Sequence, residues 1–138
     1  MGFLKEIEVN ADVDNLSTVT DFLEENLEEA GASMKAVTQI NISAEEMFVN
    51  IASYAYEGKE GKAQVVLKIE DDPLAAVITF VDSGVPFDPL AKEDPDKMRA
   101  FDEDAIGGFG ILMVKKAMDE VDYERKDGKN ILKLKKYL

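Results

Sequence analysis

The 138-residue sequence contains no histidine, no cysteine and no tryptophan. Without histidine, the chain has no histidine nucleophile, general base or metal ligand, and no site for a phosphohistidine. Without cysteine, it has neither disulfide bonds nor thiolate metal sites, which fits a reducing compartment. We therefore expect a cytoplasmic protein whose chemistry does not depend on either residue type.

Acidic residues outnumber basic ones by 29 to 16, which gives a formal net charge of −13, and arginine occurs only at Arg99 and Arg125. Nucleic acid is not expected as a direct partner, since phosphate binding needs concentrated positive charge. An acidic surface disfavours anionic membranes, and no apolar run is long enough to span a bilayer. The first residues lack the basic and apolar regions of a signal peptide.

The length predicts one domain, residues 1–138. Alternating and helical periodicities predict strands and helices in the order β-α-α-β-β-loop-α-β-β. Strands that pair as hairpins, with helices between them, favour an α/β (α+β) two-layer sandwich with helices on one face of a mixed, mostly antiparallel sheet. The expected strands are Phe3–Val9, Gln64–Glu70, Ala75–Val81, Val121–Arg125 and Asn130–Tyr137, and the expected helices reach Ala30, span Met34–Tyr56 and span Gly108–Met118.

The second of these helices carries Glu46 and Asn50 four residues apart, and Tyr54 continues the same row. This spacing places the side chains on one face of an α-helix. A carboxylate and an amide oxygen are hard donors that suit Mg²⁺, and a carboxylate can also take a proton from a hydroxyl group. The alternative interpretation is an ordinary solvated helix face.

A second polar stretch, Asp82–Asp88, follows the strand expected to be most deeply buried. An aspartate at the end of such a strand can touch a ligand over the sheet, and its carboxylate can accept from an exocyclic amine such as that of adenine. Gly84 would let the backbone pass close to a flat ring. The alternative is an Asx turn that ends the strand.

The third stretch, Gly107–Gly110, closes a long loop and is expected to open a helix. Glycines at a helix start let N–H groups converge on an anion. A flexible hinge is the alternative interpretation. The chain contains neither the phosphate loop of P-loop proteins nor the dinucleotide-binding glycine pattern.

Taken in order, E-x-x-x-N in a helix, D-x-G-x-P-F-D after a strand and G-G-x-G before a helix resemble the Bergerat (GHKL) ATP-binding fold. Within that superfamily, the sequence is similar to the anti-sigma-factor serine/threonine kinases of the RsbW and SpoIIAB type. The stretch VDSGVPFDP and the tail from Gly107 onward carry the closer similarity, and the resemblance covers nearly the whole chain.

The resemblance implies ATP and Mg²⁺ as cofactors. It implies that Glu46 is the general base and that Asn50 is the Mg²⁺ ligand. It also implies that Asp82 reads adenine, with Gly84 beside the ring.

In the same way, the resemblance implies that Gly107, Gly108 and Gly110 line the phosphates. Asn130 would stand near adenine and act through water, and Pro89–Ile106 would be the ATP lid.

Two departures from the family concern residues around this site. Tyr54 replaces a histidine that many relatives have, and the lid is acidic with Arg99 as its sole arginine. Phosphoryl transfer needs positive charge against the developing negative charge. Arg99, Lys97, Lys92 or Lys115 would have to supply this charge, and Arg99 is the expected catalytic cation.

The function implied by the resemblance is a protein serine/threonine kinase in a partner-switching pathway. It would phosphorylate a small anti-sigma factor antagonist and sequester a sigma factor or similar client, which would make it a regulator of transcription. The alternatives are a nucleotide-binding interaction module without phosphoryl transfer and a free-standing histidine-kinase-type catalytic domain. Relatives of this type are often dimers, so a homodimer is possible.

Overall fold

The computed structural model describes residues 2–88 and 105–138, with side chains described from Gly110 onward in the second range. The strands are β1 (Phe3–Asn10), β2 (Lys62–Glu70), β3 (Ala75–Asp82), β4 (Glu120–Lys126) and β5 (Lys129–Tyr137). The helices are η1 (Val13–Asn15), α1 (Leu16–Glu29), α2 (Met34–Asn50), η2 (Ile51–Ala55) and α3 (Ala105–Ala117).

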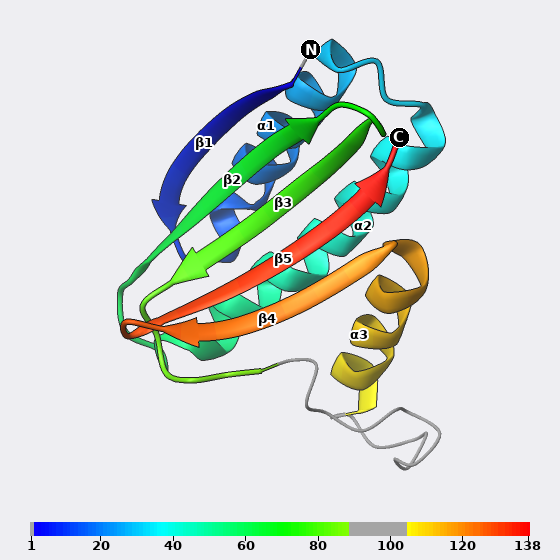
Figure 1. The fold of residues 1–138 in the computed structure, drawn as a ribbon. Coiled ribbons are helices and arrows are strands. Elements are labelled where there is room, and N and C mark those ends of the chain that lie inside the picture. Colours follow the sequence, from blue (N-terminus) through cyan, green and yellow to red (C-terminus); the bar gives the residue numbers. More distant parts are fainter. Residues whose placement is uncertain (1, 89–104) are drawn as a thin grey trace.

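The strands form one sheet in the order β1-β2-β3-β5-β4, and α1, α2 and α3 cover one of its faces (Figure 1). The predicted two-layer α+β sandwich is therefore confirmed. Every pair of neighbouring strands in the described chain is antiparallel, so the sheet is not mixed.

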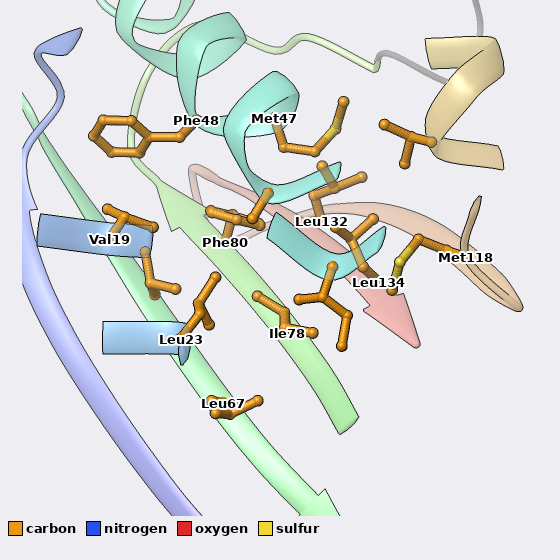
Figure 2. Packing of buried hydrophobic residues seen from close by; sticks show 14 of the residues in the cluster. Val19, Leu23, Met47, Phe48, Leu67, Ile78, Phe80, Met118, Leu132 and Leu134 are labelled. Carbon is orange, nitrogen blue, oxygen red and sulfur yellow. The ribbon is translucent and has the colours of Figure 1, made fainter. Parts of the chain in front are cut away.

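The position of the core follows from the alternation of buried and more exposed residues along the strands. In β2, residues Ala63, Val65, Leu67 and Ile69 are buried while the residues between them are more exposed. Because alternate side chains leave a strand on opposite faces, this pattern gives the sheet one apolar face for the helices. Figure 2 shows side chains from the sheet meeting those of α1 and α2 in this layer.

The start of α2 is as predicted, whereas its end is not. The Ser33 side chain accepts a hydrogen bond from Ala36 N at 3.1 Å and caps the helix. The continuous helix predicted to Tyr56 is wrong, because the α-helix ends at Asn50 and a π-helical turn, Ile51–Ala55, follows. A π-turn is wider than an α-turn, and such turns occur often at functional sites.

The start of α3 also differs from the prediction. The helix begins at Ala105, whereas the sequence predicted a start at Gly108. The glycine stretch therefore lies within the first turns of α3 and does not precede it. The predicted lid falls outside the described residues except for its last two, Ala105 and Ile106, which are helical.

The sheet face away from the helices carries interleaved charges, including the lysines of β5. Lys135 Nζ lies 3.4 Å from Glu70 Oε1 and 3.8 Å from Glu120 Oε2, and its hydrogen bond with Glu70 raises the pKa of Lys135. Because β5 lies between β3 and β4, Lys133 and Lys135 mark an exposed face and not a sheet edge, whereas Lys136 Nζ donates to Ala117 O at the end of α3. No helix in the described parts of the chain is long and apolar enough to cross a membrane.

The packing predicts that truncating two leucines of the sheet changes the free energy of unfolding by different amounts. Leu67 on β2 is fully buried, whereas Leu4 on the edge strand β1 is 56% exposed. Leu67→Ala should lower the free energy of unfolding by about 2–5 kcal/mol, because it removes buried methyl groups and leaves a cavity. Leu4→Ala should change it by no more than about 0.5 kcal/mol. Urea unfolding of both variants checks the assignment, and equal losses would contradict the predicted core.

Candidate functional site

Three distant parts of the chain meet at one end of the sandwich, where α2 and β3 end and where β4 turns into β5 (Figure 1). Side chains from these parts line a small cavity of about 20 Å³. This volume holds about one water molecule, so a larger ligand enters only if the lining moves. The lining residues are Met47, Asn50, Ile51, Ala55, Asp82, Phe87, Tyr123, Asn130 and Leu132.

Asp82 is the last residue of β3 and is only 5% exposed. Its Oδ1 accepts hydrogen bonds from Gly84 N and from Asn130 Nδ2, each at 2.9 Å. The first of these bonds is the Asx turn that the sequence offered as an alternative. Oδ2 receives no hydrogen bond from the residues that the structure describes. One carboxylate oxygen therefore shapes the turn, and the other can accept from a ligand.

Asn130 on β5 is equally buried and uses its whole hydrogen-bonding capacity within the protein. Its Nδ2 donates to Asp82 Oδ1 and, at 2.8 Å, to Val85 O. Its Oδ1 accepts from Phe87 N at 3.3 Å and from the hydroxyl group of Tyr123. An amide offers two donors and two acceptor sites, so none is left for a ligand in this arrangement. The amide thus holds other residues of the site in place.

Gly84 is buried where the chain passes the end of the π-helical turn. A Cβ at this position would overlap the backbone carbonyl of Ala55, and Val85 N donates to the same carbonyl oxygen at 2.7 Å. The sequence suggested that Gly84 allows close approach to a flat ring. In the structure, the close approach is to η2.

Tyr56 ties the same segment to β2. Its hydroxyl group donates to Lys62 O at 2.5 Å and accepts from Ser83 N at 2.9 Å. The backbone after Asp82 is therefore fixed on both sides, by Tyr56 and Ala55 on one and by Asn130 on the other.

Glu46 and Asn50 lie on consecutive turns near the end of α2, and both are half-buried. Asn50 reaches the cavity beside Asp82. Glu46 lies against Gly110 of α3, because a Cβ added to Gly110 would overlap the Glu46 carboxylate. The structure thus brings together all three stretches singled out in the sequence.

Some predicted site residues are only partly placed. Gly107 and Gly108 lie in the first turns of α3, where helix N–H groups face outward without partners in the helix. Arg99, Lys92 and Lys97 lie outside the described residues. Their expected roles stay predictions.

Sequence reasoning missed several residues that form the site. Phe87 lines the cavity, and its ring stacks on that of Tyr54 with centroids 5.7 Å apart. Tyr123 also lines the cavity, and Arg125 Nη1 donates to Gly84 O at 2.7 Å. The Asp127–Gly128 turn was a usable signal, because a tight hairpin fixes the register that brings this end of β4 beside Asn130.

The metal-binding capacity of the site is limited. The described residues contain no group of three or more acidic, histidine or cysteine side chains that could hold a metal ion. The Asn50 amide oxygen alone would not form a site. It fits Mg²⁺ that is held mainly by substrate phosphates and water, since this ion usually takes few protein ligands.

Comparison with known families agrees with this geometry. The family model described as "Histidine kinase-like ATPase domain" matches residues 9–136. The chain belongs to this family. The match spans every strand and helix that contributes to the cavity.

Curated relatives support the closer resemblance to the RsbW type. The serine-protein kinase RsbW of Listeria innocua is 28% identical over 111 residues, which cover 77% of this chain and 69% of the relative. The serine/threonine-protein kinase BtrW of Bordetella bronchiseptica is 27% identical over 95 residues, which cover 69% of this chain and 66% of the relative. The chain thus spans slightly less than two thirds of BtrW.

A solved structure shows the same fold. The structure of the RsbU and RsbW domains of Rv1364c from Mycobacterium tuberculosis superposes with a TM-score of 0.71 at 18% identity. The superposition covers 99% of this chain and 32% of the mycobacterial chain. The two-layer arrangement is therefore shared with a chain that is much longer.

Two glycines of the site should respond differently to an added methyl group. Gly84→Ala places it against the backbone of Ala55, which cannot move aside, so the variant should lose about 1–3 kcal/mol of stability. Gly110→Ala places it against the flexible end of Glu46 within a helix, where alanine is favoured by about 1 kcal/mol. Its stability should fall little or rise.

Urea unfolding of both variants measures this difference. A Gly84→Ala variant as stable as the parent would show that the backbone after Asp82 does not pass Ala55 as closely as described.

Proposed function

We propose that the chain binds Mg-ATP and transfers the γ-phosphoryl group to a serine or threonine of a small antagonist protein, as a partner-switching kinase. The observation that carries the proposal is the row formed by Asp82, Asn50 and Glu46, with a carboxylate oxygen open to a ligand amine at one end. Membership of an ATPase-domain family and relatives named serine-protein kinases support it.

The adenine base would bind at Asp82. Asp82 Oδ2, which accepts no hydrogen bond from the described residues, can accept from an exocyclic amine and would repel a carbonyl oxygen at the same place. This difference favours adenine over guanine, which carries an oxygen where adenine carries the amine. Since the cavity holds about one water molecule, its lining would rearrange when the base enters, and we place this movement at Phe87, which belongs to the segment after β3.

The phosphates would lie toward Glu46 and the start of α3. Asn50 would contribute an amide oxygen to Mg²⁺, whose charge offsets that of the phosphates when it is bound. The N–H groups at the amino end of α3 suit an anion. Because Gly110 has no side chain, the Glu46 carboxylate has room to lie beside α3.

Glu46 would act as the general base. Its carboxylate takes the proton of the substrate hydroxyl group while the hydroxyl oxygen forms a bond to the γ-phosphorus. The bond from that phosphorus to the bridging oxygen breaks, and ADP leaves with the electron pair. Arg99 of the predicted lid would stabilise the negative charge that develops on the phosphoryl group during transfer.

The partners in this proposal are a small antagonist protein as substrate and a sigma factor or similar client. A homodimer, as in many proteins of this type, is compatible with it. Neither nucleic acid nor a membrane is proposed as a partner.

One observation favours a second candidate, a nucleotide-binding interaction module without phosphoryl transfer. Arg125 is the sole arginine in the described parts of the chain, and it is bonded to Gly84 O at the adenine end of the row. The predicted lid around Arg99 is acidic. A histidine-kinase-type catalytic domain would need a phosphoacceptor histidine on another chain, because this chain has none.

Nucleotide binding is tested by thermal unfolding and calorimetry with Mg-ATP, Mg-ADP and Mg-GTP. ATP at 100 times its dissociation constant should stabilise the chain by about 2.7 kcal/mol, and the same concentration of GTP should stabilise it much less. Asp82→Asn should reduce the preference for ATP, whereas Asp122→Asn on the opposite sheet face should not. Equal affinity of the parent chain for ATP and GTP would exclude the proposed role of Asp82.

The proposed general base is tested with the variant Glu46→Gln and, as its matched control, Glu45→Gln. Glu45 is exposed and points about 100° away around the helix, so it cannot replace Glu46. Glu46→Gln should slow phosphorylation of the antagonist protein about 10²–10⁴-fold and leave Mg-ATP affinity nearly unchanged. The Glu45 variant should match the parent chain.

Full activity of Glu46→Gln would show that another group takes the proton. Tight binding of Mg-ATP by the parent chain without transfer to any antagonist would favour the interaction module.

A further inference from the structure

We propose that Tyr123, acting through Asn130, is a positioning residue that fixes the Asp82 carboxylate and thereby sets the preference for adenine. The inference rests on the proposed nucleotide binding and adds a residue on β4 to it. Tyr123 reaches Asp82 through one intervening side chain, because its hydroxyl group donates to Asn130 Oδ1 and Asn130 Nδ2 donates to Asp82 Oδ1.

The surroundings of Asn130 allow only one orientation of its amide. Rotating the group by 180° would point its oxygen at two acceptors, Asp82 Oδ1 and Val85 O, and its NH₂ group at the N–H of Phe87. Buried polar groups without partners are costly, so this rotated state is excluded. The Tyr123 hydroxyl group must therefore be the donor to Asn130 Oδ1.

The importance of the Tyr123 hydrogen bond follows from the weakness of the other hydrogen bond that Asn130 Oδ1 accepts. The second donor to Asn130 Oδ1 is Phe87 N, at 3.3 Å, which is long for such a bond. Phe87 lines the cavity, and in the proposed binding mode it moves when a base enters. While Phe87 moves, the bond from Tyr123 keeps the amide anchored to the sheet, so that Nδ2 stays on Asp82.

The anchored amide in turn orients the carboxylate. Two donors on Oδ1, Gly84 N and Asn130 Nδ2, fix the plane of the group and the position of Oδ2. With Gly84 N alone, the carboxylate could rotate, and Oδ2 would no longer face one fixed point. Loss of this orientation should weaken the favourable contact with the adenine amine and relieve the repulsion of the guanine oxygen.

The quantity to measure is therefore the ratio of ATP affinity to GTP affinity. If Tyr123 only stabilised the fold, removing its hydroxyl group would not change this ratio. Tyr123→Phe removes the hydroxyl group and keeps the ring in the cavity wall. The matched control is Tyr137→Phe, because Tyr137 lies at the other end of the same hairpin, is 44% exposed and has its hydroxyl group 3.4 Å from Glu120 Oε2.

Calorimetric titration of Mg-ATP and Mg-GTP into the intact chain and both variants tests the proposal. Tyr123→Phe should lower the ATP-to-GTP ratio about three- to tenfold, the range expected for one hydrogen bond of ordinary strength. Tyr137→Phe should keep the parent ratio. A second variant, Asn130→Ser, should lower the ratio as well, and adding Tyr123→Phe to it should cause no further fall, because Tyr123 acts through Asn130.

Each other outcome has a distinct meaning. If a folded Tyr123→Phe variant keeps the parent ratio, or if its affinities for both nucleotides fall equally, the positioning role is wrong while the proposed nucleotide binding stands. If the parent chain itself binds neither nucleotide or binds both equally, the proposed function of Asp82 fails, and the role of Tyr123 fails with it.

Discussion

The site depends on one buried amide, that of Asn130. Its four hydrogen bonds join β5 to the end of β3, to the backbone of Val85 and Phe87, and to the Tyr123 hydroxyl group on β4. Because unpaired polar groups at such a position are costly, these elements can occupy only a narrow range of relative positions. The amide thereby orients the Asp82 carboxylate, although its own donors and acceptor sites are all used within the protein.

A second constraint comes from the end of α2. The π-helical turn after Asn50 carries Ala55 so close to Gly84 that a side chain on Gly84 would overlap it. This contact seats the backbone after Asp82 against the helix, while Asn50 and Glu46 precede the turn on regular α-helix. The end of α2 and the turn after it therefore line the cavity beside Asp82, while Glu46, one turn earlier, lies against Gly110 of α3.

Much of this arrangement could be predicted from the sequence. Alternating apolar residues gave the strands, and the spacing of Glu46 and Asn50 gave their common face, because periodicity depends only on local geometry. The π-turn could not be predicted, since i+4 and i+5 spacings look alike over one turn. The start of α3 was also missed, because the glycines of its first turns have low helix propensity and tertiary contacts override it. The roles of Tyr123 and Asn130 depend on strand register and on a buried network that no local pattern reveals.

The most direct test of the account is a crystal structure of the chain with Mg²⁺ and ADP. We expect the adenine amine to donate to Asp82 Oδ2, Asn130 still to donate to Oδ1, and Phe87 to have moved away from the cavity between Asn50 and Asp82. A nucleotide bound elsewhere on the chain, or an Asp82 carboxylate that makes no contact with the base, would contradict it.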